Sequence, residues 1–438
     1  MEMNIVIVGA GLGGLGTALA LKIAAPSINV LVLEAAAELA EIGAGLQLTP
    51  NATRELLRWG LGDRLEKVAT NPEVFTILSY KGDKLLGKRN GFGEEMSSKY
   101  GAPFWDMHRA DLQIAMFERA QDLGVKFRFG VTVTTYDFEG SKVSLSNGDE
   151  VSGDLIIAAD GLWSKARAEF LGSNESPLPT GDLAYRIVLN TEIIEDEDLK
   201  EFVSKPRVHL WVGPDCHAIY YPLRNNSMIN IVLLVPDDLP ENVAKAPGDI
   251  GQMKEIFRDW DPLLQRLLAL VPEVQKWRLM NNTEMDSWCN EKGTIAFLGD
   301  ACHPMLPYMA QGANSSLEDG AVLGGLIAKA HDKLDLPALL QIYQHLRKPR
   351  SLAIVEASFK QRHTNHLRNG PEQQQRDKIL EEQFQEPLPG YPFYWLDPQS
   401  QGWIYSYNAY EEAEMAWKSF LRNDNSIGFG NTSKQARI

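Results

Sequence analysis

The sequence predicts an α/β fold of the Rossmann-like kind, because three apolar, strand-like segments each run into a turn and then a helix. These segments are residues 4–16, 153–167 and 293–314. A helix that begins directly after a strand presents unpaired N–H groups and a partial positive charge, which suit an anion. From Leu183 to about Val235 the pattern changes to successive strands, so a separate second sheet is expected.

The first segment reads Asn-Ile-Val-Ile-Val-Gly-Ala-Gly-Leu-Gly-Gly-Leu-Gly. Gly9 permits a tight turn, Gly11 lets the backbone approach a pyrophosphate, and Gly14 lets the helix pack closely on the strand. The next strand ends at Glu34, 20 residues beyond Gly14, where an acidic side chain takes the hydroxyls of an adenosine ribose. Strand, glycine turn, helix, strand and acid in this order predict dinucleotide binding rather than a merely structural glycine-rich turn.

The third segment joins a carboxylate, a stiff turn and a helix start. A strand-like run ends at Gly299-Asp300, Pro304 and Pro307 stiffen the loop, and Gly312 opens a helix expected to reach about residue 329. An ordinary strand–loop–helix crossover is the alternative reading of such a short motif. The glycine turn near the N-terminus favours a ligand-binding segment over that alternative.

Charge and cysteine content favour a soluble enzyme. The chain has 438 residues, 43 Lys and Arg against 58 Asp and Glu, and a net charge of −15. This balance disfavours nucleic acid and anionic membranes as partners. The three cysteines are far apart and form no C-x-x-C pattern, so neither a metal site nor a disulfide framework is expected.

Residues 5–25 are apolar enough to suggest a membrane span, but five of them are glycines of the nucleotide turn. No charged start or cleavage site marks a signal peptide. The expected location is therefore the cytoplasm, with reduced thiols. The final Ala436-Arg437-Ile438 loosely resembles a peroxisomal address, which makes the peroxisome the alternative.

The other elements follow in order. Residues 50–59 read as a short helix, and an amphipathic helix is expected from 109 to about 123. Strand-like runs lie at 126–129, 132–137, 142–146, 153–160, 184–190, 208–212, 217–222 and 228–234, followed by helices within 248–271. Residues 337–365 read as one long helix, 371–385 as a charged, solvated segment, and the aromatic residues of 389–407 should pack back onto the body.

Three motifs together resemble the single-component FAD-dependent aromatic hydroxylases. They are Gly9-x-Gly11-x-x-Gly14, Asp160-Gly161-x-x-Ser164-x-x-Arg167 and Gly299-Asp300. The segments 41–51, 312–320 and 403–409 are typical of the subgroup of salicylate hydroxylase and 6-hydroxynicotinate monooxygenase. The resemblance spans almost the whole chain. It implies the para-hydroxybenzoate hydroxylase fold: a Rossmann-like FAD-binding domain, an inserted mixed β-sheet substrate domain and C-terminal helices.

The resemblance also implies how the chain divides. Residues 1–70, 105–180 and 281–335 would form the FAD-binding domain. The insertion at 71–104 would join residues 181–280 in the substrate domain, and 336–438 would form the C-terminal helical region and tail.

One non-covalent FAD per chain is implied, with NAD(P)H as co-substrate. Glu34 would bind the adenosine ribose, Arg109 the pyrophosphate or ribityl chain, and Asp300 the ribityl hydroxyls. The backbone at Gly312, Ala313 and Asn314 would face the flavin pyrimidine edge, where the helix dipole favours negative charge. The rest of the predicted cofactor set is Gly9, Gly11, Gly14, Gly45, Gln47 and Asp160, the last also in handling NAD(P)H. The ordinary alternatives are a surface pair of Arg109 with Asp111 and a strand-end cap at Asp160.

Four residues are expected to serve the substrate. His217 and Tyr221 resemble the family's His-x-x-x-Tyr-Pro strand, and positions four apart on a strand point to one face. They would orient or deprotonate a ring hydroxyl, whereas Tyr220 points the opposite way; a core histidine and an interface tyrosine are the alternative. Arg186 would hold a substrate carboxylate or form a salt bridge on the second sheet, and Pro307 would lie near the reacting ring.

The resemblance implies that NAD(P)H reduces FAD, that O2 then gives a flavin C4a-hydroperoxide, and that an electron-rich ring takes its distal oxygen. The predicted reaction is hydroxylation of a phenolic or hydroxylated heteroaromatic, carboxylated small molecule, such as salicylate or 6-hydroxynicotinate, by a monomer or homodimer. One alternative is a flavoprotein monooxygenase that oxidises or epoxidises a secondary metabolite. The other is a non-catalytic carrier on the same fold, against which the intact Asp160 and Asp300 motifs argue.

Overall fold

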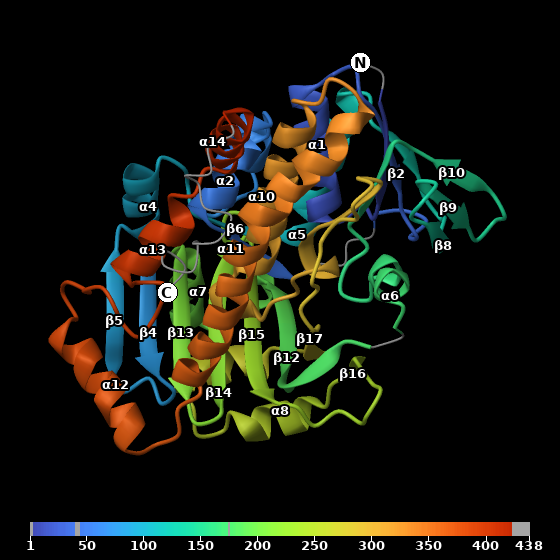
Figure 1. Ribbon diagram of the computed structural model, residues 1–438. Helices are drawn as coiled ribbons and strands as arrows, with labels where there is room; N and C mark the ends of the chain where they lie inside the picture. Colours follow the sequence, from blue (N-terminus) through green and yellow to red (C-terminus); the bar gives the residue numbers. More distant parts are fainter. Residues whose placement is uncertain (1–2, 40–43, 174–175, 423–438) are drawn as a thin grey trace.

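The computed structural model describes residues 3–39, 44–173 and 176–422, which form two large β-sheets with helices around them (Figure 1). The smaller sheet is parallel and has the order β18 (Ile295–Phe297), β11 (Leu155–Ala158), β1 (Asn4–Val8), β2 (Asn29–Leu33) and β7 (Lys126–Arg128). Its central strands read as unbroken apolar runs because both of their faces are buried.

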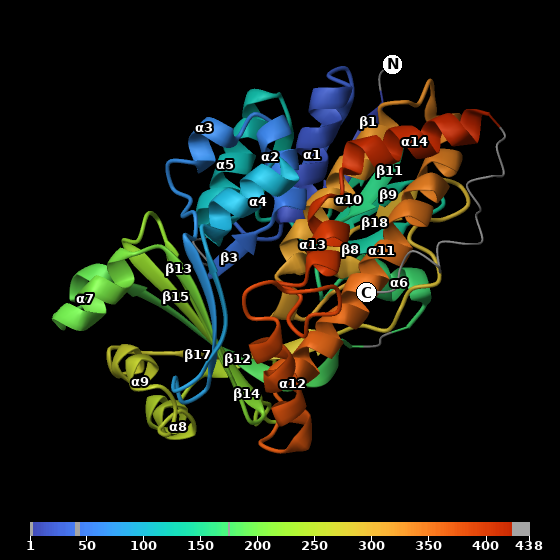
Figure 2. The ribbon, with the colours of Figure 1, turned by 90° about the vertical axis from the view of Figure 1, so that its left-hand side faces the viewer.

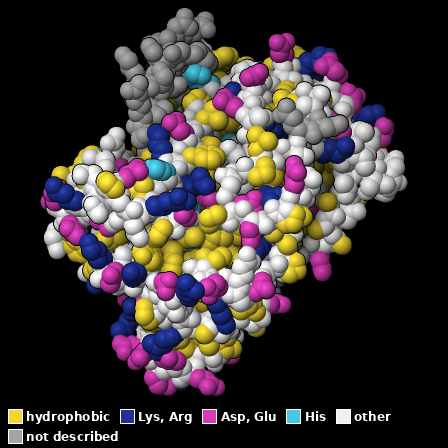
Figure 3. Space-filling view, turned by 90° about the horizontal axis from the view of Figure 1, so that it is seen from below, with side chains coloured by type: hydrophobic (Ala, Val, Ile, Leu, Met, Phe, Trp, Pro, Cys, Tyr) yellow, Lys and Arg dark blue, Asp and Glu magenta, His cyan; other side chains and the backbone are white. Residues whose placement is uncertain are grey.

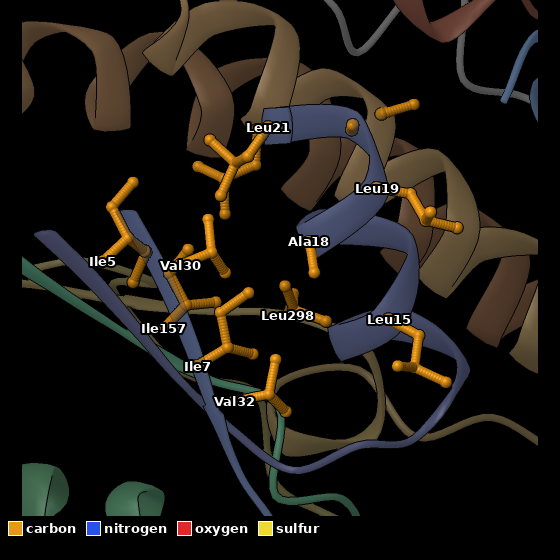
Figure 4. Close-up of a cluster of buried hydrophobic side chains, with 14 of the residues drawn as sticks. Ile5, Ile7, Leu15, Ala18, Leu19, Leu21, Val30, Val32, Ile157 and Leu298 are labelled. Atoms are coloured by element: carbon orange, nitrogen blue, oxygen red, sulfur yellow. The ribbon is translucent and has the colours of Figure 1, made fainter. Parts of the chain in front are cut away.

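Helix α1 (Leu12–Ala24) covers one face of this sheet. Figure 4 shows its side chains beside those of the strands, among them Leu15, Ala18, Leu21, Ile7, Val30 and Val32. Helix α10 (Gln311–Ile327) packs closely on α1, since a Cβ at Gly324 would lie 2.5 Å from the Ala20 Cβ. Residues 5–25, apolar enough to suggest a membrane span, are therefore a buried strand and helix. In the described part of the chain, no helix combines the length and apolarity needed to cross a bilayer.

The larger sheet is mixed and has eight strands. Its order is β16 (Lys245–Pro247), β17 (Gln275–Asn281), β12 (Leu178–Asn190), β15 (Met228–Pro236), β14 (Cys216–Leu223), β13 (Arg207–Gly213), β4 (Val74–Ser79) and β5 (Leu85–Asn90). The β13–β4 pair is parallel and the other pairs are antiparallel. It brings the insertion of residues 71–104 into the same sheet as residues 178–281, while the predicted domain boundaries stay a prediction.

Helices cover both faces of the mixed sheet. Figure 2 shows α7 (Glu197–Ser204), α8 (Ile250–Ile256) and α9 (Pro262–Ala269) on one side. On the other side lie α11 (Leu336–Asn365), α12 (Pro371–Glu382) and α13 (Pro398–Tyr405). Because α11 also packs on α10, it ties the two sheets together.

The remaining elements are short or peripheral. The helices are α2 (Pro50–Arg58), α3 (Gly62–Leu65), α4 (Phe92–Tyr100), α5 (Arg109–Asp122), α6 (Lys165–Leu171) and α14 (Ala409–Leu421). Strands β3 (Gly45–Leu48) and β6 (Trp105–His108) pair with each other, and β8 (Val133–Asp137), β9 (Lys142–Leu145) and β10 (Glu150–Ser152) form a small sheet. Single 3₁₀ turns lie at Thr191–Ile193, Gly299–Ala301, Pro307–Met309 and Lys333–Asp335.

Two segments differ from their predictions. Residues 371–385, expected to be solvated, contain α12, whose inner side buries Arg376 against Asp377. A charged pair on the buried side hides the apolar periodicity that marks a helix. Helix α4 within the insertion was not expected either.

Figure 3 shows acidic and basic side chains interspersed on one face of the molecule. The proposed peroxisomal address at residues 436–438 lies outside the described residues.

Candidate active site

A cavity of about 320 Å³ is lined on one side by strands of the mixed sheet and on the other by turns and helix starts that follow strands of the parallel sheet. Of the predicted site residues, its wall includes Gly11, Gly45, Gln47, Arg109, Arg186, His217, Tyr221, Asp300, Pro307, Gly312 and Ala313. Five others, Gly9, Gly14, Glu34, Asp160 and Asn314, lie behind this wall or beyond it. The fold therefore gathers residues that are up to three hundred positions apart in the sequence.

The glycine turn after β1 has the geometry that a bound pyrophosphate requires. Gly9 has a φ of +107°, and a Cβ there would lie 2.3 Å from the Ala159 carbonyl oxygen. A Cβ at Gly14 would lie 2.1 Å from the Gly9 oxygen, so helix and strand touch through backbone. A Cβ at Gly11 would instead meet nothing within 4 Å. This space lies at the N-terminus of α1, where unpaired N–H groups attract phosphate.

Glu34 follows β2 and is held by backbone. Its two carboxylate oxygens accept the N–H groups of Ala10 and Ala36, both at 2.8 Å. A carboxylate oxygen has a second lone pair, so this anchoring leaves capacity for a ribose hydroxyl. The predicted ribose contact stays a prediction.

Asp300 and Arg109 face the same cavity. Burial raises the pKa of the Asp300 carboxyl, and the nearby His303 and Arg109 act against that rise. The surface pair of Arg109 with Asp111 is wrong, because Asp111 accepts two hydrogen bonds from Arg224, both at 2.8 Å. Within the described ranges Arg109 forms no ion pair, which leaves its guanidinium for an anionic ligand.

The Asp300 loop is fixed from behind by Asp319 of α10. The Asp319 carboxylate accepts the Gly299 N–H at 3.0 Å, contacts His303 Nε2 at 2.5 Å and pairs with Arg347 Nε at 2.8 Å. Burial alone would raise the pKa of Asp319, but His303 and Arg347 outweigh it and hold the pKa at about 2. A charged and fully bonded carboxylate thus sets the position of the loop.

The start of α10 presents backbone to the cavity. Gly312 and Ala313 lie in its first turn and line the wall. The Asn314 side chain is used elsewhere: its oxygen accepts the Thr49 N–H at 3.0 Å and its nitrogen donates to the Gln47 oxygen at 2.9 Å. Asn314 therefore ties the helix start to β3, and only backbone of this turn is open to a ligand.

Gly45 and Gln47 of β3 join the two walls. The Gly45 N–H donates to Asn230 at 2.7 Å, and a Cβ at Gly45 would lie 2.5 Å from the Tyr221 ring. The Gln47 amide donates to the buried Asp106 carboxylate at 2.8 Å. Gly45 thus makes room for a substrate-side tyrosine, a role that its glycine motif does not reveal.

Asp160 supports the start of helix α6, whose N-cap is Ser164. It accepts the Ser164 hydroxyl at 2.5 Å and the Ala166 N–H at 3.1 Å at the start of α6, and burial raises its pKa. Its neighbours Ala159 and Gly161 line the cavity, whereas Asp160 does not. Asp160 thus has a structural role at the junction between the end of β11 and the start of α6, and its part in NAD(P)H handling stays a prediction.

The substrate-side wall follows from the pleat of the mixed sheet, because alternate residues of a strand face opposite sides. The residues facing the cavity are Ala184, Arg186, Leu210, His217, Ile219, Tyr221, Val232 and Leu234. Their neighbours Tyr185, Ile187, Ala218, Tyr220, Ile231 and Leu233 are buried in the core beneath α7, α8 and α9. The opposite directions predicted for Tyr220 and Tyr221 are therefore present.

Tyr221 and Arg186 present open polar groups. Burial raises the pKa of the Tyr221 hydroxyl, which makes no hydrogen bond to any residue that the structure describes. Arg186 lies over the Trp277 ring at 5.0 Å, and burial and the nearby Arg109 lower its pKa. Its exposed surface faces the cavity. The alternative salt bridge on the sheet is wrong for the described chain, so Arg186 is available to an anion.

His217 is supported by residues that sequence reasoning missed. Its Nδ1 lies 2.7 Å from Nε2 of His366, and burial lowers its pKa well below the ordinary range. His366 in turn lies 3.8 Å from Asp182. Because these residues stand on separate elements far apart in the chain, no local pattern marks them.

Together these features suit a protein that binds a dinucleotide cofactor such as FAD. The Gly11 opening, Glu34, Asp300 and the two helix N-termini are the groups predicted for its phosphates, ribose, ribityl chain and ring, and these assignments stay a prediction. The polar groups on the mixed sheet face the same cavity from the other side.

Comparison with known proteins gives the family. A family model described as FAD binding domain matches residues 2–358. The chain is 46% identical over 417 residues to FAD-dependent monooxygenase OpS4 of Beauveria bassiana (strain ARSEF 2860), over 94% of this chain and 97% of that protein. It is 31% identical over 361 residues to 3-hydroxybenzoate 6-hydroxylase of Polaromonas naphthalenivorans (strain CJ2), over 82% and 86% of the two chains. A solved salicylate hydroxylase substrate complex has the same fold, with a TM-score of 0.75 and 22% identity over 95% and 98% of the chains.

The chain belongs to the FAD-binding class A flavoprotein monooxygenases, a family that includes aromatic hydroxylases. The predicted para-hydroxybenzoate hydroxylase type of fold, the FAD cofactor and the enzyme class are thereby confirmed. NAD(P)H is the co-substrate typical of this family.

Proposed function

We propose that this monooxygenase acts on a secondary metabolite that carries an electron-rich, hydroxylated ring and an acidic group. The identity of 46% to OpS4 exceeds the 31% to 3-hydroxybenzoate 6-hydroxylase. This ranking favours the secondary-metabolite alternative over simple acids such as salicylate or 6-hydroxynicotinate. The simple aromatic acids remain the second candidate, because relatives named for hydroxybenzoates still match most of the chain.

The observation that carries this proposal is one wall with three kinds of polar group set in apolar surroundings. Arg186, His217 and Tyr221 all face the cavity from the mixed sheet. An unpaired guanidinium suits a carboxylate, which it binds through two parallel hydrogen bonds. The imidazole and phenol suit a ring hydroxyl. A non-catalytic carrier has no need of this set.

In the proposed mechanism, FAD held without a covalent bond would, once reduced by NADH or NADPH, supply the activated oxygen. Arg186 anchors the acidic group and fixes the ring against Pro307. Tyr221 hydrogen-bonds the ring hydroxyl, and His217 accepts its proton at Nε2, since burial keeps this imidazole neutral near pH 7. Leu210, Ile219, Val232 and Leu234 exclude water from the reacting centre.

A substrate panel tests the proposal. We expect larger polyhydroxylated aromatic acids to stimulate NAD(P)H oxidation with a matching amount of oxygenated product, measured by absorbance and mass spectrometry. Salicylate, 3-hydroxybenzoate and 6-hydroxynicotinate should give little product. Tight coupling with one of these three acids would support the second candidate, and oxygenation of non-aromatic compounds alone would contradict the proposed ring chemistry.

Tyr221→Phe tests the assignment of the wall. The variant should keep FAD and its reduction by NAD(P)H, because the ring shape is unchanged, yet lose hydroxylation by ~10²–10⁴ as the orienting hydroxyl is gone. Oxygen should still consume the electrons, so H2O2 should rise as product falls. Unchanged product per NAD(P)H on the true substrate would place the activating group elsewhere.

A further inference from the structure

A row of polar side chains leads away from the cavity behind His217. His217 on β14 contacts His366 at the C-terminus of α11, with 2.7 Å between Nδ1 and Nε2. The other ring nitrogen of His366, Nδ1, lies 3.8 Å from Oδ2 of Asp182 on β12. His217 lines the cavity, and the His366 side chain keeps 9% of its surface exposed to solvent.

The Asp182 carboxylate cannot turn away from His366. Arg362, one turn earlier on α11, donates from Nε and Nη2 to its two oxygens, both at 2.5 Å. The hydroxyl of Tyr308, the residue after Pro307, donates to the same carboxylate. Asp182 is thus a fixed negative charge behind the imidazole pair.

The fixed charge determines which nitrogens carry hydrogen. A distance of 3.8 Å is too long for a direct hydrogen bond but short enough for a strong electrostatic preference in a buried site. His366 Nδ1 faces the carboxylate and therefore carries the hydrogen, which leaves Nε2 as an acceptor. His217 must then donate from Nδ1, so the lone pair of its Nε2 faces the cavity.

We infer that Asp182 and His366 are positioning residues that hold His217 as a base and conduct the ring-hydroxyl proton from the cavity to the end of α11. The O–H bond of the ring breaks as an N–H bond forms at His217 Nε2. The Nδ1 hydrogen of His217 passes to His366 Nε2, and the Nδ1 hydrogen of His366 leaves to solvent. The proton part of this inference rests on the proposed function, whereas the tautomer part does not.

The surrounding charges suit transfer rather than storage of a proton. Asp182 on β12 and Asp215 between β13 and β14 raise the pKa of His366, and Arg362 on its own helix lowers it. Burial has the largest influence, and the resulting pKa is about 4. Arg368 forms an ion pair with Asp215 at 2.8 Å and weakens its effect. Both imidazoles are therefore neutral between transfers.

The tautomer is measurable without substrate. Long-range ¹H–¹⁵N correlation spectra of the ¹⁵N-histidine-labelled holoenzyme, assigned with His217→Asn, should show His217 protonated at Nδ1. Asp182→Asn should add the Nε2-protonated form, while His363→Gln should change nothing at His217. His363 is the matched control because it lies on the same helix, exposed and paired with Glu372 at 2.6 Å. A wild-type His217 protonated at Nε2 would overturn the inference.

The relay is measured with 4-hydroxy-3-nitrobenzoate, a phenolic acid whose absorbance reports its ionisation. After a pH jump on the oxidised holoenzyme, His366→Gln should slow ionisation of the bound probe about tenfold or more. Its amide still accepts from His217 but cannot pass a proton on. Probe affinity should stay as in the wild type, and His363→Gln should ionise it at the wild-type rate. A wild-type rate in His366→Gln would overturn the relay even if the substrate panel succeeds. If the substrate panel failed, the spectra of the histidine tautomers would still test the part of the inference that concerns Asp182 and His366.

Discussion

The two walls of the cavity are built by different means. The wall beside the parallel sheet presents mainly backbone, with Arg109 and Asp300 as its charged side chains: Gly11, Gly13, Gly299 and Gly312 line it, and the α1 and α10 N-termini point toward it. The wall beside the mixed sheet presents side chains on alternate strand positions. If the predicted assignments hold, the cofactor shared by the family meets mainly backbone that few substitutions change, whereas the substrate meets side chains that are easily exchanged.

Behind each wall lies a buried carboxylate paired with an arginine, yet the two arginines differ in their exposure to solvent. Asp319 and Arg347, behind the Asp300 loop, are wholly buried. Asp182, behind His217, is buried as well, but its partner Arg362 is 33% exposed. The cofactor side is thus closed and rigid from behind, while the substrate side keeps a polar route to water.

The largest effect is expected where the cofactor wall touches its own backbone. Gly14→Ala would place a Cβ 2.1 Å from the Gly9 oxygen, so the strand must shift. We expect the shift to lower the free energy of unfolding by about 1–3 kcal/mol and to distort the pyrophosphate site. The purified variant should be colourless and melt at a lower temperature than the wild-type apoprotein. Flavin absorbance and thermal unfolding measure both effects.

Gly11→Ala is the matched control. Its Cβ meets no protein atom within 4 Å, so the apoprotein should melt normally but bind FAD poorly, because the methyl group occupies the phosphate space. Full FAD in Gly11→Ala would show that the cofactor does not lie at this turn.

The next effect concerns the buried support of the Asp300 loop. Asp319→Asn leaves Arg347 without one of its two carboxylates, and should lower the free energy of unfolding by about 2–3 kcal/mol near neutral pH. The pKa of Asp319, about 2, is below the ordinary aspartate value. Its stabilisation is therefore present above pH ~4 and is lost as the pH falls to about 2.

Urea unfolding across this pH range measures the effect. The wild type and Asp319→Asn should differ most near neutral pH and converge in acid. The control is Asp196→Asn, since Asp196 also has a pKa of about 2 but pairs with Arg266 at the surface. Water screens that pair, so a loss as large as in Asp319→Asn would contradict the importance of burial.

The cofactor half of this comparison was predictable from sequence and the substrate half only partly so. Gly9, Gly11, Gly14 and Gly312 are marked by local patterns, because a backbone that approaches a phosphate or starts a helix after a strand needs glycine at set spacings. Positions four apart on one strand also gave His217 and Tyr221 a common face.

Contacts between distant elements were not predictable. Asp182 meets Arg362 across 180 positions, and nothing in either neighbourhood announces the pair. Asn314 was predicted to face the flavin through its backbone, but its side chain reaches β3, which no local pattern announces. The parallel pairing of β13 with β4 depends on three-dimensional packing, so the insertion could be expected in the second domain without its place in the sheet.

A smaller effect is expected for the anion anchor of the substrate wall. Arg186→Ala should raise the KM for a carboxylated substrate about 10- to 100-fold, the value of one or two charge-assisted hydrogen bonds. FAD content should be unchanged, since Arg186 stands on the opposite wall. Arg109→Ala should instead lower the affinity for FAD. Loss of FAD in Arg186→Ala, measured by absorbance after gel filtration, would mean that the walls are not separate in function.

The smallest effect belongs to Tyr220, the neighbour of Tyr221 on the same strand. Its ring lies in the core beneath α7, α8 and α9, and its buried hydroxyl has no hydrogen-bond partner among the described residues. A buried hydroxyl without a partner destabilises the fold, so Tyr220→Phe should leave stability unchanged or raise it by up to about 1 kcal/mol. Coupling of NAD(P)H oxidation to product should equal that of the wild type, because the pleat directs this side chain away from the cavity. Thermal unfolding and product per NAD(P)H, measured beside Tyr221→Phe, make the comparison. If Tyr220→Phe uncoupled the enzyme as strongly as Tyr221→Phe, the two faces of β14 would not divide packing from chemistry.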